Sequence, residues 1–185
     1  MYALGRPVFV TWRLHGSLPP NRHFDRAGMT SGEAFAVMDR LLDEGSRGPV
    51  YLRREDVAAL VVDAIRFNAA ELRHYKLHAF VVMPNHVHLL ASPLVPLSRM
   101  MKSLKGITAK RANALLGLTG NPFWQEESFD HVVRDEKEFE KIRFYIENNP
   151  VRAGLAVRAE EFLWSSAAGA TEGSPADPGV RPTWG

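Results

Sequence analysis

The sequence predicts an α+β fold in which helices cover one face of an antiparallel sheet. Three observations support this class: a strictly alternating strand near the N-terminus, two apolar strands joined by a tight turn, and amphipathic helices on either side of that pair. The expected order of elements is typical of α+β domains: a strand, a long helix, a pair of strands, a helix and a last strand. We expect the second face of the sheet to be free for a ligand.

Length and composition are those of an ordinary globular protein with one core: 185 residues, 45% apolar and 24% charged. No apolar run approaches the ~20 residues that cross a bilayer, and the N-terminus lacks the pattern of an export signal. We therefore expect a cytoplasmic protein with no membrane partner and no organic cofactor. The absence of cysteine excludes disulfides, a thiolate zinc site and a cysteine nucleophile.

The overall charge is nearly balanced, with 23 Lys and Arg against 21 Asp and Glu. Bulk charge therefore does not predict a nucleic-acid partner, and a basic surface has to come from local clustering.

The N-terminal half is expected to hold one strand, a loop and two helices. The alternation of Val8–Leu14 predicts the strand, and Gly, Pro and Asn in His15–Arg26 predict the loop. Apolar residues at helical spacing predict helices over Ser31–Glu44 and Glu55–His74. On the strand, one side carries Val8, Val10, Trp12 and Leu14, and the other carries Phe9, Thr11 and Arg13.

The middle of the chain predicts an antiparallel hairpin followed by a helix. Leu77–Met83 is rich in β-branched and aromatic residues, Pro84-Asn85 turns the chain, and His86–Ser92 returns as the second strand. Leu97–Leu116 has the pattern of an amphipathic helix. Its expected buried side comprises Met100, Met101, Leu104, Ile107 and Leu115.

The following segment predicts a short strand and a capped helix. Phe129–Arg134 has the composition of the strand. Asp135 can cap the helix, with Glu138 three residues later as in a capping box. We expect the helix to end at about Asn149, because Pro150 disfavours helical geometry in the residue before it.

The C-terminal region predicts a turn at Gly154, a last short element over Glu160–Ser166, and a tail. Residues 167–185 are dense in Gly, Pro, Ala and Thr, a composition typical of disorder. We therefore expect one domain over residues 1–166 and a disordered tail over residues 167–185.

The segment His86-Val87-His88 is a candidate metal site. Residues two apart on a strand face the same side, so the two imidazoles stand together while Val87 faces the other way. Two imidazoles without thiolates, with room for an oxygen ligand, suit a divalent ion that stays open to substrate. The pair alone is a weak signal, because two partly exposed strand histidines without a function give the same pattern.

The last long helix presents a candidate nucleophile. Tyr145 lies at the edge of its apolar stripe, and Asn149 follows one turn later on roughly the same face. In one active site, Tyr145 would attack and the Asn149 oxygen would bind the metal. The pattern identifies no base, and by itself it also fits a packed edge tyrosine and a helix-ending asparagine.

Four sequence blocks occur together and in a fixed order. They are the opening strand over Val10–Pro19, the Met-Pro-Asn-His-Val-His block within His78–Leu90, the aromatic and acidic block Phe123–Asp130, and the Asn-Pro-Val-Arg-Ala-Gly-Leu block within Phe144–Leu155. In these blocks the chain resembles the REP-associated tyrosine transposases, a branch of the single-tyrosine HUH (histidine–hydrophobic–histidine) transposases. The resemblance covers about Val8–Ser166.

The resemblance implies a ferredoxin-like (RRM-like) sheet of the HUH endonuclease type, with the tyrosine supplied by a following helix. It implies a Mg²⁺ or Mn²⁺ ion held by His86, His88 and Asn149, although related branches have glutamine at the last position. Tyr145 would form a transient phosphotyrosine link to the 5′ side of a nick and leave a free 3′ hydroxyl. The implied substrate is a single-stranded hairpin from palindromic repeats near the gene, in a bacterial cytoplasm, with the DNA-bound protein at the nucleoid.

The helix over Leu97–Leu116 carries a basic stripe. Arg99, Lys102 and Lys105 fall three apart, away from the apolar side, and Lys110 and Arg111 extend the stripe. Phosphate contacts from these side chains would position DNA without reading its sequence. An ordinary solvated helix face gives the same pattern.

Three other interpretations remain open: a DNA-hairpin-binding protein or regulator whose site has decayed, another HUH enzyme such as a replication initiator or relaxase, and an RNA-binding or structural ferredoxin-like domain. Intact His86, His88 and Tyr145 argue against decay, and the chain has little room for the accessory domains of larger HUH enzymes. The sequence leaves open whether a homodimer forms and whether Tyr145 acts in its own chain or in a partner.

Overall fold

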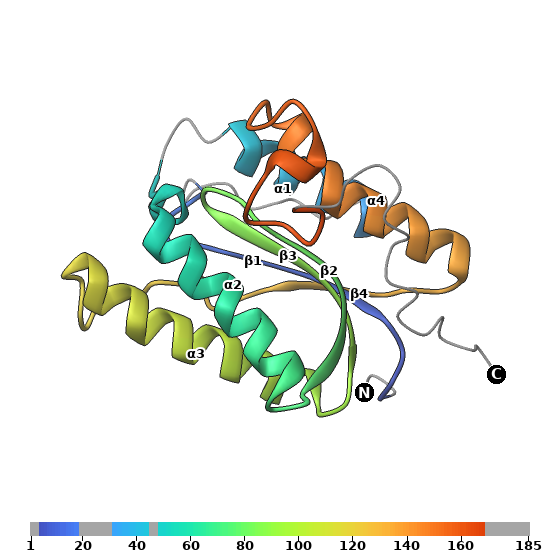
Figure 1. The fold of residues 1–185 in the computed structure, drawn as a ribbon, viewed down its shortest axis with the longest axis horizontal. Helices are drawn as coiled ribbons and strands as arrows, with labels where there is room; N and C mark the ends of the chain where they lie inside the picture. Colours follow the sequence, from blue (N-terminus) through green and yellow to red (C-terminus); the bar gives the residue numbers. More distant parts are fainter. Residues whose placement is uncertain (1–3, 19–30, 45–47, 169–185) are drawn as a thin grey trace.

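The computed structural model describes residues 4–18, 31–44 and 48–168. Its centre is a four-stranded antiparallel sheet in the order β2-β3-β1-β4 (Figure 1). The strands are β1 (Val8–Arg13), β2 (Tyr75–Val82), β3 (His86–Pro93) and β4 (Phe129–Val132). Helices separate β1 from β2 and β3 from β4, which gives the split βαβ arrangement of ferredoxin-like folds. The predicted α+β class is confirmed.

Helices α2 (Glu55–Ala70) and α3 (Leu97–Leu116) cover one face of this sheet (Figure 1). Alternate residues of each strand point into this layer, as expected for a strand with one buried set per face. The strand residues in this core are Val8, Val10, Trp12, Tyr75, Phe80, Val82, Val87, Leu89 and Ala91, and Leu14 joins them directly after β1. The predicted side assignment of the first strand is therefore confirmed.

The second face is not free, contrary to the expectation. Helix α4 (Glu136–Arg152) packs on it, and α1 (Ser31–Glu44) joins at one end through Phe35. The reason is that β1 and β3 carry apolar residues on both faces, and the second set needs its own cover. The residues of this second core are Phe9, Ala79, Val81, Met83, Leu90, Val133, Phe139 and Ile146.

Helix α2 ends at Ala70 and not at His74 as expected. Arg73 has a φ of 51°, a left-handed backbone conformation that a helix cannot contain. His74 instead pairs through Nδ1 with the side chain of Asn68, and the chain then enters β2 at Tyr75. The preceding Leu72, an apolar residue within the predicted helix, is exposed.

Helix α3 has the predicted bounds but a different buried face. Ile107 and Leu115 were expected in the core, yet they are 38% and 47% exposed. The buried line continues from Leu104 to Thr108 and Ala112, four residues apart, because the small side chains allow the helix to lie close to its neighbours. Thr108 satisfies its hydroxyl by donating to the carbonyl of Leu104.

Helix α4 runs through Pro150 to Arg152, so the predicted end at Asn149 is wrong. Proline removes one helical N–H, but the carbonyls of Asn149 and Pro150 still accept hydrogen bonds from Ala153 and Leu155. The helix ends where Gly154 adopts a φ of 70°.

The predicted cap of α4 is half right. The Asp135 carboxylate accepts from the backbone N–H of Glu138, as a cap does. The Glu138 carboxylate accepts from the backbone N–H of Arg134 and not from that of Asp135, so the reciprocal capping box does not form.

After α4 the chain makes a 3₁₀ turn over Ala159–Glu161 and then lies along the outer edge of β2. Val82 N–H donates to the Trp164 carbonyl, and Ser166 N–H donates to that of Phe80. Most of the predicted tail and most of the predicted loop over His15–Arg26 lie outside the described residues. Among the helices that the structure describes, none is long and apolar enough to cross a membrane.

Candidate functional site

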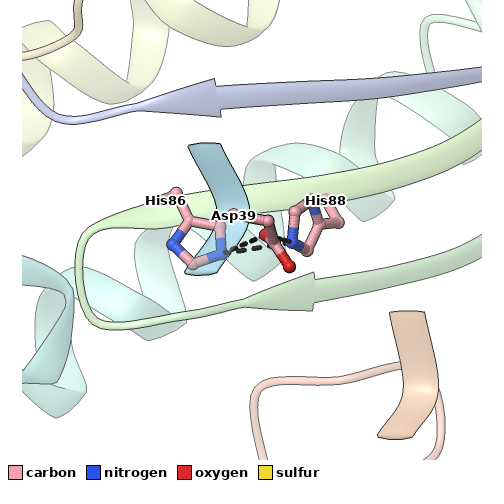
Figure 2. A group of neighbouring side chains, drawn as sticks. All are labelled: Asp39, His86 and His88. Carbon is pink, nitrogen blue, oxygen red and sulfur yellow. Dashed lines mark hydrogen bonds and ion pairs between the residues drawn. The ribbon is translucent and has the colours of Figure 1, made fainter. Parts of the chain in front are cut away.

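The two histidines lie side by side on β3, which runs between β1 and β2. Both side chains are fully buried, which differs from the partly exposed alternative considered above. Their Nε2 atoms are 3.1 Å apart (Figure 2). Two ring nitrogens at this distance can share one cation, which is the arrangement that the His-x-His spacing predicted.

Hydrogen bonds behind the rings fix their orientation. The Asn85 amide donates through Nδ2 to the carbonyl of Leu42, so its Oδ1 faces Nδ1 of His86 at 2.7 Å. That oxygen can only accept, so the proton of His86 sits on Nδ1 and the lone pair of Nε2 is free. The Thr11 hydroxyl lies 2.7 Å from Nδ1 of His88 and can accept in the same way, because the register places Thr11 opposite His88.

Asp39 completes the group from helix α1 (Figure 2). Its Oδ1 lies 3.0 Å from Nε2 of His88 and 3.5 Å from Nε2 of His86. Sequence reasoning missed this residue. A signal was present: Asp39 stands four residues after Phe35 and three before Leu42, so it is a carboxylate on the apolar stripe of a predicted helix.

The electrostatics of the site keep its donor atoms ready for a cation. Burial lowers the pKa of His86 to about 3, and the nearby His88 adds to this, so its imidazole is neutral. Burial would raise the pKa of Asp39, but contact with His88 and nearby positive charge, including that of Arg152, outweigh it and hold this pKa low. A neutral imidazole and an ionised carboxylate are the metal-binding forms of these side chains.

Asp43 lies one turn after Asp39 and differs from it. Burial, and then the negative charge of Asp39, raise the pKa of Asp43 to about 6. Its Oδ1 is buried without a hydrogen-bond partner among the described residues.

Asn149 reaches the same point from α4. Its side chain is buried, and its amide nitrogen lies 3.4 Å from Nε2 of His88. Its Oδ1 has no hydrogen-bond partner in the described part of the chain. A half-turn of the amide exchanges oxygen and nitrogen at little steric cost and would present the oxygen to the histidines.

Tyr145 lies one turn before Asn149 and beside the histidines of its own chain. Its ring centroid is 5.7 Å from that of His88, and the rings of Phe9 and Phe35 pack edge-on against it. The phenol oxygen is buried and, within residues 4–18, 31–44 and 48–168, has no hydrogen-bond partner. A packed ring with a free hydroxyl is consistent with a nucleophile held in position.

A cavity of about 1150 Å³ opens next to this group. Asp39 and Tyr145 line it, whereas His86 and His88 do not. Tyr145 and Asp39 therefore form part of the cavity wall, although the phenol and carboxylate oxygens themselves are buried. The other lining residues include the rings of Phe9, Phe35 and Phe129 and the cations Arg40, Arg134, Lys141 and Arg152.

The basic stripe of α3 does not come together with this group. Helix α3 packs on the face of the sheet opposite to the histidines. Lys105 is partly buried and donates to the carbonyl of Glu126. The exposed members are Arg99, Lys102, Lys110 and Arg111.

The donor set fits a divalent cation. Two imidazole nitrogens and a carboxylate oxygen, all buried, lie within 4.8 Å of one another. The unpartnered oxygen of Asn149 adds a fourth donor close by. Nitrogen and oxygen ligands without sulfur suit Mg²⁺, Mn²⁺ or Zn²⁺ and disfavour softer ions.

Comparison with known proteins agrees with this picture. The sequence model of the IS200-like transposases matches residues 52–149, just over half of the chain, and the match includes both histidines, Tyr145 and Asn149 but not Asp39. No curated protein matches the chain.

The chain is similar to two solved structures, one of which has a TM-score above 0.5. The structure of a REP-associated tyrosine transposase bound to a REP hairpin is 19% identical and has a TM-score of 0.55, covering 89% of this chain and 78% of that one. A candidate transposase from Deinococcus radiodurans R1 is 20% identical with a TM-score of 0.39, covering 80% of this chain and 92% of that one. With the family match over the histidines and the tyrosine, and a fold shared with a REP-associated tyrosine transposase, this chain belongs to the IS200-like transposase family.

Proposed function

We propose that this protein nicks and rejoins single-stranded DNA, using Tyr145 as the nucleophile and a Mg²⁺ or Mn²⁺ ion held by His86, His88, Asp39 and Asn149. The observation that carries the proposal is that the phenol, the carboxylate and the two imidazoles, which come from three separate elements, meet beside one cavity. Because all of these groups belong to one chain, we propose that Tyr145 acts with the histidines of its own chain.

The chemical step is a transesterification. The Tyr145 oxygen attacks the phosphorus of a DNA phosphodiester and loses its proton to water, and an oxygen–phosphorus bond forms. The bond from phosphorus to the 3′ oxygen breaks, and that oxygen leaves with the electron pair and takes up a proton. The products are a 5′-phosphotyrosine link and a free 3′ hydroxyl, and attack by a 3′ hydroxyl reverses the step.

Other residues of the chain would orient the metal ligands and position the Tyr145 ring. A divalent ion bound at this group would polarise the phosphodiester and hold it in line for attack. Asn85 and Thr11 hold the imidazoles in the tautomer that leaves Nε2 free. Phe9 and Phe35 fix the Tyr145 ring, which keeps the phenol close to the bound phosphate.

We propose a single-stranded hairpin from a palindromic repeat as the substrate, which would bring the protein to the nucleoid. The support is the solved structure of a REP-associated tyrosine transposase bound to a REP hairpin, whose fold is similar to that of this chain. The exposed cations of α3, Arg99, Lys102, Lys110 and Arg111, would contact phosphates of the hairpin outside the cavity.

The test is formation of a covalent protein–DNA adduct. Labelled single-stranded oligonucleotides copied from the palindromes that flank the gene are incubated with Mg²⁺, with Mn²⁺ or with a chelator, and resolved on a denaturing gel. We expect a metal-dependent adduct that disappears in Tyr145→Phe. The matched control is Tyr51→Phe, because Tyr51 stacks on Phe123 in the core on the opposite face of the sheet and should leave the adduct unchanged. Binding without an adduct under every condition would favour a decayed hairpin-binding protein.

A further inference from the structure

Arg152 is an unusual neighbour for a nucleophile. It lies in the last turn of α4, seven residues after Tyr145 and therefore on nearly the same face of the helix. Its guanidinium carbon is 4.8 Å from the centroid of the Tyr145 ring. Both side chains line the cavity that also contains Asp39. A cation is thus placed over the ring whose hydroxyl is proposed to attack phosphorus.

The charge of Arg152 is not neutralised by a direct partner. In the described part of the chain, no carboxylate lies within ion-pair distance of Arg152, whereas Arg134 in the same cavity is paired with Glu138 at 2.8 Å. The charge of Arg152 nevertheless faces the site, because Arg152, Asp39 and Asp43 line the same cavity. The guanidinium is therefore close to the proposed metal group and available to an anion.

The proposed function brings one specific anion to this place, the phosphodiester under attack. A guanidinium offers several N–H donors in a planar fork that matches two phosphate oxygens. Contact with an aromatic face leaves those edge donors free and limits the rotamers of the long side chain. The non-bridging oxygens carry much of the negative charge of the phosphoryl group during attack, so a fixed cation beside them lowers the barrier.

Resting on the proposed function, we propose that Arg152 binds the non-bridging oxygens of the scissile phosphate while its guanidinium packs on the Tyr145 ring. The same contact then stabilises the phosphotyrosine diester after the strand is cut. Arg152 is in this view a catalytic residue, since it touches the reacting phosphate, and packing of the ring alone is the rival role.

The first experiment measures the single-turnover rate of adduct formation in Arg152→Gln and Arg152→Lys. The control is Arg143→Gln, which removes the same charge from the other side of α4, where Arg143 lies beside Glu147 and Glu140. We expect Arg152→Gln to lose roughly tenfold to a hundredfold in rate, Arg152→Lys to recover part of the loss, and Arg143→Gln to match the wild type. Thermal unfolding of each variant checks that the fold is kept.

The second experiment separates phosphate binding from ring packing. A neutral methylphosphonate replaces the scissile phosphate of the oligonucleotide. If Arg152 contacts that phosphate, the rate loss in Arg152→Gln and the loss from the methylphosphonate overlap, and the combined loss is smaller than the product of the two. Losses that multiply would overturn the inference, because they would show that the arginine acts independently of the charge it is proposed to bind.

A third measurement does not depend on cleavage. In a Tyr145→Phe background, the salt dependence of single-strand binding should become shallower by about 0.7 when Arg152 is changed to Gln, the value for one phosphate contact on a single strand. An unchanged slope would contradict the inference. Failure of the proposed function looks different, because the wild-type protein itself would then form no adduct.

Discussion

The Nε2 atom of His88 lies 3.0 Å from Oδ1 of Asp39, although the strand and the helix that carry them are distant in the sequence. This contact joins helix α1 to the face of the sheet that carries the two histidines. It also makes Asp39 the carboxylate of the group, although Asp39 lies far from the His-x-His segment in the sequence. The divalent-ion site therefore depends on how α1 docks, and this dependence leads to the first prediction.

Asp39→Asn should weaken Mn²⁺ binding at least about tenfold, because the substitution keeps the shape of the side chain but removes the only carboxylate among the proposed ligands. Titration calorimetry with Mn²⁺ measures the affinity directly. Asp63→Asn is the control, since Asp63 is an exposed aspartate on α2. Equal affinity in Asp39→Asn and the wild type would remove Asp39 from the site.

Tyr145→Phe should leave the free energy of unfolding within about 0.5 kcal/mol of the wild type, because the phenol oxygen makes no hydrogen bond with the described residues. Tyr75→Phe is the matched comparison. The Tyr75 hydroxyl donates to the carbonyl of Ile65 at 2.7 Å, so losing it should cost about 1 kcal/mol. Urea denaturation of both variants measures the difference. A large destabilisation by Tyr145→Phe would indicate a structural hydroxyl.

Thr11→Val should reduce metal affinity about tenfold to a hundredfold without opening the strand, since valine has nearly the shape of threonine but cannot accept from Nδ1 of His88. Thr11→Ser keeps a hydroxyl and should retain most of the affinity. The measurement is the same Mn²⁺ titration. Loss in both variants would point to packing of the methyl group and not to the hydrogen bond.

Acid should destabilise the metal-free protein in part through His78. Burial, and then the charge of Lys76, lower the pKa of His78 to about 4 from an ordinary value of 6.5. Between these two pH values the unfolded chain binds a proton at His78 that the folded chain does not bind. The contribution of His78 to the free energy of unfolding is therefore fully present above about pH 6.5 and is lost as the pH falls toward 4.

His78→Gln should therefore reduce the fall in Tm between about pH 7 and about pH 5 by a few degrees, measured by calorimetry in chelator. Part of the fall should remain, because His86 is also buried with a lowered pKa. A fall as steep in His78→Gln as in the wild type would show that His78 is protonated in the folded protein.

Replacing Lys102 and Arg111 on α3 with Gln should weaken hairpin binding and its salt dependence while leaving the single-turnover cleavage rate unchanged. The reason is that these exposed side chains lie on the face of the sheet opposite to the site. Binding at several salt concentrations and the rate at saturating protein separate the two effects. If the dependence of hairpin affinity on salt concentration stayed the same, the basic residues of α3 would not contact the DNA.

Local patterns predicted much of this molecule. Alternation placed the two sides of β1 correctly, and helical periodicity gave the bounds of α1 and α3. The errors occurred where local rules compete with tertiary contacts. Pro150 lies inside α4 because its carbonyl and that of Asn149 find partners further along, and Ile107 is exposed because Thr108 and Ala112 let α3 approach its neighbours closely.

The sequence by itself determined the fold class, the pair of imidazoles on one strand face, and the spacing of Tyr145 and Asn149 on one helix face, because each of these depends on the repeat of a single element. Only the tertiary structure decided that α1 and α4 cover the histidine face, that Asp39 meets His88, and that Arg152 lies over the Tyr145 ring at a shared cavity. Those contacts depend on how apolar surfaces of distant segments pack together, and no single segment carries that information.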